Sequence, residues 1–170
     1  MRGPLTRVVR MRTQRVVLRV ASQREVAAVA RMQAEAALVE HRLIPDVAAR
    51  RHDVANGRRY WRRALRGSRK RLFIAVRGCE VLAAIGVDLI VARHRWATVR
   101  RRIYLHSLYV TPRARRYRLA QGLTRLALDW GRGRGATQAR LEMAAPNRSA
   151  RALYESLGFR AREMMFARPL

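Results

Sequence analysis

The segment that most constrains the fold is an apolar run at residues 71–92, RLFIAVRGCEVLAAIGVDLIVA, which is broken near its middle by RGCE. Isoleucine, valine and leucine are frequent in both halves, and these residues suit the buried faces of strands. Gly78 lies between the halves and supplies the backbone freedom that a tight turn needs. The run therefore predicts a β-hairpin with its turn at residues 77–80.

Strand and helix patterns alternate through the rest of the chain. Short β-branched runs predict strands at residues 15–21, 103–110, 136–146 and 162–170, and apolar residues at helical spacing predict helices at 22–39, 56–66, 119–132 and 149–158. The helix between the strands at 103–110 and 136–146 implies a parallel pair with a right-handed crossover. The order indicates an α/β fold with a single mixed sheet and helices on both faces.

The length and composition fit one domain. With 170 residues, 49% of them hydrophobic, the chain is long enough for one core and short for two domains. We expect a basic, flexible arm at residues 1–15 and a single domain at 16–170. The arm is rich in arginine and lacks the apolar core of a secretory signal, which leaves a cleaved organelle-targeting segment as the alternative.

Cysteine usage and hydropathy bear on the location of the protein. Cys79 is the only cysteine, which excludes an intramolecular disulfide and a thiol cluster for zinc. We therefore expect a reducing, cytoplasmic location and no metal. No apolar run approaches the length of about 18 residues that a membrane span needs, so no membrane partner is expected.

The charge of the chain is extreme. Lysine and arginine number 38 against 11 aspartate and glutamate residues, a formal net charge of +27, and Lys70 is the only lysine. A positive field of this size attracts polyanions, so one explanation of the charge is a partner such as RNA, DNA or an anionic surface. The other explanation is a coding preference for arginine on solvated faces. In the predicted helix at 56–66, Tyr60 and Trp61 serve either as stacking partners for a polyanion or, more simply, as the side that covers the sheet.

Three stretches in the C-terminal half form one pattern: LYVTPRARR, LDWGRGRGA and LEMAAPNRSARALYESLGF. Together they resemble the GNAT superfamily of acetyl-coenzyme A-dependent N-acetyltransferases, most clearly over residues 103–159 and by element order over nearly the whole chain. The most specific part is N..A..LY..LGF, which begins at Asn147 and ends at Phe159. The resemblance implies a mostly antiparallel sheet in which a central pair of strands splays apart.

The same resemblance implies where the coenzyme binds. The gap between the splayed strands admits the pantetheine arm, which backbone amides of one strand end hold; that strand end corresponds to Leu108, Tyr109 and Val110. Asn147 corresponds to a residue that bonds the pantetheine or the turn holding it, although an isolated asparagine after a proline is also a plain loop cap.

A phosphate-binding turn follows in the family, with the pattern Arg or Gln, two residues, Gly, one residue, then Gly or Ala. The matching positions are Arg115, Arg116, Tyr117, Arg118, Leu119 and Ala120. Free amides at a helix N-terminus stabilise the pyrophosphate there. Arg118 stands where the family has glycine. If the backbone of residue 118 has a negative φ, the Arg118 side chain can bind phosphate; if the position needs a positive φ, arginine strains the turn.

For the catalytic residues, the resemblance implies a general acid but no single general base. Tyr154 corresponds to a tyrosine that protonates the departing thiolate as general acid, whereas a core tyrosine is the plainer interpretation. A general base is needed for the amine, and the candidates are His106, which shares a strand face with Tyr104 and Leu108, and with less support Asp88 and Glu142.

The sequence therefore predicts an N-acetyltransferase that moves an acetyl group from acetyl-coenzyme A to a primary amine of a small molecule, peptide or protein by direct attack. Arginines within residues 33–66 make an acidic acceptor plausible. The alternative is a weakly active or inactive GNAT-like module whose basic surface binds nucleic acid or the ribosome. A monomer and a homodimer are both compatible with the sequence.

Overall fold

A computed structural model describes residues 5–44, 53–94, 96–163 and 165. The elements are β1 (Arg7–Met11), β2 (Gln14–Val20), α1 (Val26–Leu43), α2 (Val54–Ala64), β3 (Lys70–Arg77), β4 (Glu80–Val91), β5 (Arg101–Val110), a short 3-10 turn (Pro112–Ala114), α3 (Leu119–Arg132), β6 (Gln138–Leu141) and α4 (Arg148–Ser156). Within these residues the strands form one six-stranded sheet in the order β1-β2-β3-β4-β5-β6. Each neighbouring pair is antiparallel except β5 and β6, which are parallel.

The predicted hairpin at residues 71–92 is confirmed as β3 and β4. Gly78 lies in its turn with a φ of 58°, a conformation that glycine adopts without strain. Side chains of β3 alternate between two cores: Phe73 and Ala75 pack in one, and Leu72 and Ile74 pack in the other. Both faces of these strands are therefore buried, which explains why their sequence is almost continuously apolar.

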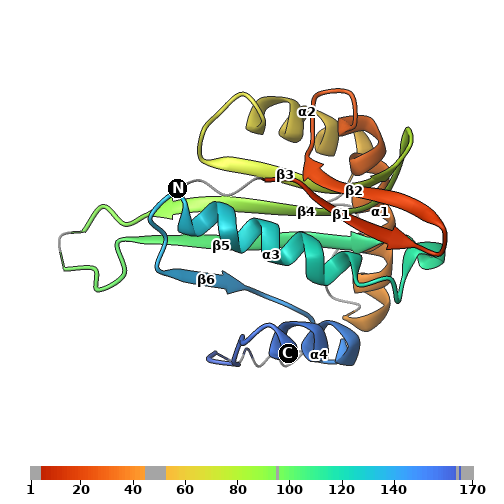
Figure 1. Ribbon diagram of the computed structural model, residues 1–170. Helices are drawn as coiled ribbons and strands as arrows, with labels where there is room; N and C mark the ends of the chain where they lie inside the picture. The colour runs from red at the N-terminus through yellow and green to blue at the C-terminus, as the bar shows by residue number, and fades with distance from the viewer. Residues whose placement is uncertain (1–4, 45–52, 95, 164, 166–170) are drawn as a thin grey trace.

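Helices cover both faces of the sheet, as predicted (Figure 1). On one face α3 lies along the strands and buries Leu119, Leu123 and Leu126 in the first core. On the other face lie α1 and α2, and Trp61 of α2 is buried in the second core. The Trp61 indole N–H donates to Gln33 Oε1 at 2.9 Å, which ties α2 to α1. The predicted α/β class with a mixed, mostly antiparallel sheet is confirmed.

Both ends of the chain differ from the sequence-based expectations. Residues 7–11, which we assigned to a flexible arm, form β1 and pair with β2 through a turn that contains Arg12. The strand predicted at 136–146 is confined to β6 at Gln138–Leu141. Of the strand predicted at 162–170, the described residues 162, 163 and 165 lie outside any strand, and the others are outside the described residues.

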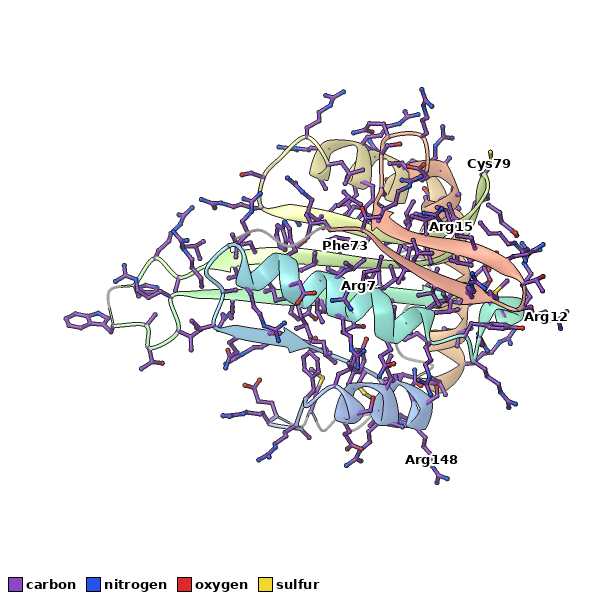
Figure 2. All side chains as sticks on the ribbon, in the orientation of Figure 1. Arg7, Arg12, Arg15, Phe73, Cys79 and Arg148 are labelled. Atoms are coloured by element: carbon purple, nitrogen blue, oxygen red, sulfur yellow. The ribbon has the colours of Figure 1, made fainter. Side chains whose placement is uncertain are left out.

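The arginine residues spread over the whole molecule. Figure 2 shows nitrogen-tipped side chains projecting around its outline, with Arg12 beyond the β1–β2 turn and Arg148 beyond α4. The exposed Cys79 lies in the β3–β4 turn. In the described part of the chain no helix combines the length and the hydropathy needed to cross a membrane.

Candidate active site

The site begins where β5 and β6 separate. Their parallel pairing runs from Arg102 opposite Gln138 to Leu105 opposite Leu141 and ends there, while β5 continues to Val110. On its other side β5 stays paired with β4 up to Val110. The edge of β5 from residue 106 to residue 110 therefore has no strand partner among the described residues, which is the splayed central pair that the sequence led us to expect.

A β-bulge at Ser107 sets the direction of the side chains at this edge. His106 pairs with Gly86 and Tyr109 pairs with Ala84, so β5 has one residue more than β4 between these two pairs. Ser107 has a φ of 53°. Leu108 consequently packs against the core under α3, whereas His106 stacks on Trp61 in the opposite layer. The expectation that His106 and Leu108 share a face is wrong, because the extra residue reverses the alternation.

His106 is held on four sides. Its ring lies 5.6 Å from the Trp61 ring and 6.2 Å from the Tyr104 ring, measured between centroids, and is nearly parallel to the first. Its Nε2 lies 3.3 Å from Asp88 Oδ1 and its Nδ1 lies 3.1 Å from Ser107 Oγ. With about a fifth of its side chain exposed, the imidazole is oriented by the protein and still reachable.

Asp88 fixes which nitrogen of His106 carries the proton. Burial alone raises the pKa of the Asp88 carboxyl, but hydrogen bonds from His106 and Lys70 outweigh it and bring the pKa below its ordinary value. An ionised carboxylate only accepts hydrogen bonds, so Nε2 donates to Asp88, and in the neutral form of the ring Nδ1 is the nitrogen that carries the lone pair. Asp88, which the sequence offered as a candidate base, is thus placed to orient His106.

Lys70 completes the network behind Asp88. Its Nζ lies 2.6 Å from Asp88 Oδ2 and 2.6 Å from the Tyr60 hydroxyl oxygen. Burial lowers the pKa of Lys70, and the bonds to Asp88 and Tyr60 reverse that shift and raise the pKa. The only lysine of the chain therefore stays charged and keeps Asp88 ionised.

Gly86 makes room for the His106 ring against the sheet. A Cβ at this position would lie 2.5 Å from His106 Cε1 and 2.8 Å from Trp61 Cη2. We expect Gly86→Ala to lower the free energy of unfolding by about 1–3 kcal/mol because the stacked rings must move, measured by urea denaturation. Gly67→Ala is the control, since a Cβ there would lie no closer than 3.5 Å to its neighbours. Equal stability of the two variants would show that the rings are not tightly packed on Gly86.

A cavity of about 290 Å³ opens beside His106 between β5 and the two helices α1 and α2. It is lined by Ala30, Gln33, Asp53, Asn56, Gly57, Tyr60, His106 and Ser107. None of these described lining residues is an arginine. The described arginines of residues 33–66, where arginine suggested an acidic acceptor, therefore do not line the cavity, and Asp53 contributes the carboxylate in its wall.

The phosphate-binding turn expected at residues 115–120 lies between the 3-10 turn and α3. Among the backbone hydrogen bonds of the described residues, none has an amide of residues 116–121 as its donor. These amides lie at the N-terminal end of α3, where the helix dipole is positive. Arg12 Nε donates to the Tyr117 hydroxyl at 3.2 Å, so the β1–β2 turn braces this segment. The turn has the free donors that a phosphate group requires.

Arg118 has a backbone conformation that glycine adopts more readily than any other residue. Its φ and ψ are 57° and 19°, the left-handed region, and Arg116 also has a positive φ of 69°. Left-handed geometry at a residue with a Cβ is destabilising by about 1 kcal/mol or more. Of the two alternatives that the sequence left open for Arg118, the structure has the strained backbone, and the helix that follows is nonetheless intact.

Tyr154 lies on α4, the helix that Figure 1 shows below β6. Its ring makes an edge contact with Phe159, with 5.6 Å between centroids, and Phe159 packs on the core under α3. Burial raises the pKa of the Tyr154 hydroxyl to about 12, so it stays protonated at neutral pH. A protonated hydroxyl is what a general acid needs.

Asn147 and Glu142 have local roles in the structure. The Asn147 side-chain oxygen accepts from the Ala150 amide at 3.1 Å and from Ser149 Oγ at 3.0 Å, so it caps α4. Glu142 is exposed just after β6, and its charge adds to burial in raising the pKa of Tyr104. The described contacts do not bring Glu142 to His106.

Ser107, Lys70 and Gly86 were not singled out by the sequence analysis. A glycine inside a strand pattern can signal a close approach of other groups, so Gly86 carried a usable signal. Ser107 carried none, because the bulge arises from pairing between strands. Lys70 was noted only as the single lysine of the chain, because its link to Asp88 depends on the register of β3 and β4, where the two residues pair.

Comparisons with known proteins agree with this architecture. A mutant of the BH1408 protein from Bacillus halodurans superposes with a TM-score of 0.77 at 18% identity, covering 90% of this chain and 98% of that chain. A predicted acetyltransferase from Clostridium acetobutylicum, solved with acetyl-CoA, has a TM-score of 0.72 at 15% identity, with 91% and 96% covered. The aminoglycoside N-acetyltransferase AAC(6')-Iy in complex with CoA has a TM-score of 0.69 at 16% identity, with 95% and 99% covered.

At such identities these structures show the fold alone. None of the curated proteins searched matches the chain. The family model described as the acetyltransferase (GNAT) family matches residues 36–159, which is most of the chain and includes the splayed strands, the turn before α3 and Tyr154. The chain belongs to the GNAT family of acetyltransferases.

Proposed function

We propose that this protein transfers an acetyl group from acetyl-coenzyme A to a primary amine by direct attack, with His106 as general base and Tyr154 as general acid. The observation that carries the proposal is the oriented His106, which faces a cavity directly beside the unpaired edge of β5. An amine held in the cavity would meet a base on one side and the splayed strands on the other.

The described residues fit the coenzyme. The free edge of β5 at Leu108, Tyr109 and Val110 offers backbone groups for the pantetheine arm. The unpaired amides of residues 116–121 suit the pyrophosphate, and the exposed side chains of Arg115, Arg116 and Arg118 add positive charge around them. Bound there, acetyl-coenzyme A supplies the acetyl group as a thioester.

His106 prepares the nucleophile. An amine is mostly protonated at neutral pH and attacks only after it loses a proton. Nδ1 holds the lone pair that accepts this proton, either directly or across the Ser107 hydroxyl 3.1 Å away. The positive charge that forms on the imidazole is stabilised by Asp88, which faces Nε2. The neutral amine nitrogen then forms a bond to the acetyl carbon as the carbon–sulfur bond breaks, and Tyr154 donates its proton to the departing thiolate. The second proton that the nitrogen loses on becoming an amide passes through solvent and restores the Tyr154 hydroxyl.

The cavity also suggests the class of acceptor. Its volume of about 290 Å³ is near the lower end of ordinary small-molecule sites. Gln33, Asn56 and the Tyr60 hydroxyl offer polar groups, and the Asp53 carboxylate favours a cation. We infer that a small amine, or an amine at the end of a narrow chain, fits better than an acidic acceptor.

A coupled assay tests the proposal. The protein is incubated with acetyl-coenzyme A and a panel of primary amines, and acetylated amine is detected by mass spectrometry. At least one amine is expected to be acetylated faster by wild type than by His106→Gln. Acetyl-coenzyme A that binds but is transferred to no amine faster than in buffer would instead favour the inactive module.

The strained turn gives a separate prediction. Arg118→Gly is expected to raise the free energy of unfolding by about 1 kcal/mol, because glycine adopts the left-handed conformation freely. The melting temperature should rise by about 2–4 °C. Arg125→Gly is the matched control: it removes the same charge from an exposed position inside α3, where glycine is expected to destabilise by about 1 kcal/mol.

Calorimetric titration of acetyl-coenzyme A against the same variants tests the coenzyme site. Wild type is expected to bind, with affinity similar to or weaker than that of Arg118→Gly, because the backbone amides are the main donors. No binding by wild type and recovery in Arg118→Gly would show that arginine has disabled the site.

A further inference from the structure

The outer face of α2 and the turn that follows it carry five arginines, none of which lines the cavity of the candidate active site. We define the α2 arginine face as Arg58, Arg59, Arg62, Arg63 and Arg66; all five are exposed. With 3.6 residues per turn they fall within an arc of about 140°. The opposite side of the helix buries Trp61 and Ala64, so the whole arginine face is directed away from the sheet.

This face is not neutralised by the protein. None of its five arginines forms an ion pair with a described residue, and Arg59 donates only to Asn56 Oδ1 at 2.7 Å. Residues 54–79 contain no aspartate or glutamate. Arginines elsewhere do find carboxylates, as Arg7 does with Asp129 and Arg151 with Glu155. Like charges three or four residues apart on a helix repel one another and destabilise it, and a bound external anion would offset this repulsion.

The shape and composition of the face decide between anionic partners. The five side chains and Ala55 line a surface hollow of about 600 Å³. No large apolar side chain lines this hollow. A membrane-binding helix inserts such side chains into the lipid, and a protein–protein interface usually has an apolar core. A phosphate backbone needs neither, and the planar guanidinium group binds phosphate through two parallel hydrogen bonds.

We propose that the α2 arginine face binds the phosphate backbone of a nucleic acid without reading its sequence. Arg58 and Arg62 are about 6 Å apart along the helix axis, and Arg66 follows in the turn directly after α2, so the three form a row that can contact successive phosphates of one strand. The row is separate from the cavity, because Gly57 and Tyr60 of the cavity wall lie on the opposite side of α2; the face meets the cavity only at Asn56, which accepts from Arg59.

Two triple variants test this proposal. One replaces the row (Arg58→Gln, Arg62→Gln, Arg66→Gln), and the matched control removes the same charge from exposed arginines without ion pairs elsewhere (Arg10→Gln, Arg93→Gln, Arg125→Gln). Binding to a fluorescent single-stranded RNA of 20 nucleotides is measured by anisotropy over a range of salt concentrations. Thermal unfolding is measured for each variant, so that a folding defect is recognised independently.

The row variant is expected to bind RNA about tenfold more weakly, and its slope of log affinity against log salt should be shallower by about 2, since each phosphate contact on a single strand contributes about 0.7. The control should keep the wild-type slope. The proposal is overturned if both variants lose affinity and slope equally, or if wild type does not bind RNA. It is also overturned if poly-glutamate of the same charge competes as well as RNA, because that result would identify an acidic protein as the partner.

Discussion

Replacing His106 with glutamine is expected to lower kcat about 10²- to 10⁴-fold, the usual range for the loss of a general base. Glutamine is similar in size to histidine and can bond Asp88 and Ser107, so the strand and the cavity should be preserved. It cannot accept a proton at neutral pH. The measurement is steady-state kinetics with the acceptor identified in the amine screen, together with the affinity for acetyl-coenzyme A, which should change little.

His94→Gln provides the control for this experiment, because His94 is an exposed histidine in the segment between β4 and β5. The loss in His106→Gln should fall on kcat, while KM for the amine should change little. An equal fall of kcat in His94→Gln would show that the effect is not specific to His106.

Tyr154→Phe is the second large effect. Removal of the hydroxyl takes away the proton donor for the departing thiolate, so kcat is expected to fall about 10²- to 10⁴-fold while the dissociation constant of acetyl-coenzyme A stays nearly the same. Phenylalanine keeps the edge contact with Phe159. Unchanged turnover in Tyr154→Phe would leave Tyr154 with a packing role only.

The raised pKa of Tyr154 also has a consequence for stability that does not depend on turnover. Its hydroxyl has a pKa of about 12 in the folded protein and about 10 in the unfolded chain. The unfolded state therefore releases this proton first, and stability falls as the pH rises from about 10 to 12. Tyr154→Phe should lose less stability than wild type over that window, which is measured by denaturant unfolding at each pH.

The predictable parts of the fold are those that local patterns determine. The hairpin at residues 71–92 and the helix at 119–132 have strong periodicity and a clear glycine or proline boundary, and both were predicted nearly to the residue. β1 was missed because its five residues, RVVRM, are too short and too basic to stand out from an arm. Pairing with β2 makes this segment a strand, and pairing partners are not visible in a local pattern.

The candidate site also has a part that the sequence could indicate and a part that it could not. His106, the turn before α3 and Tyr154 lie in motifs that run along the chain, so the sequence indicated them. The partners of His106 come from other strands and from α2, and only the register of the sheet brings Asp88 and Trp61 to its ring. The left-handed backbone of Arg118 was recognised as one of two alternatives, because side-chain identity alone does not determine φ.

The bulge at Ser107 changes the phase of β5 halfway along its length. Without the extra residue, Leu108 and Val110 would point toward the cavity and Tyr109 into the core beneath α3. With it, Tyr109 reaches the α1 side, where its hydroxyl donates to Glu35 Oε2 at 3.1 Å, and the two aliphatic residues stay in the core. One strand thus has two halves of opposite phase. The first half pairs with β6 and belongs to the continuous sheet. The second half has a free backbone edge toward the gap, and its apolar side chains nevertheless stay packed against the core.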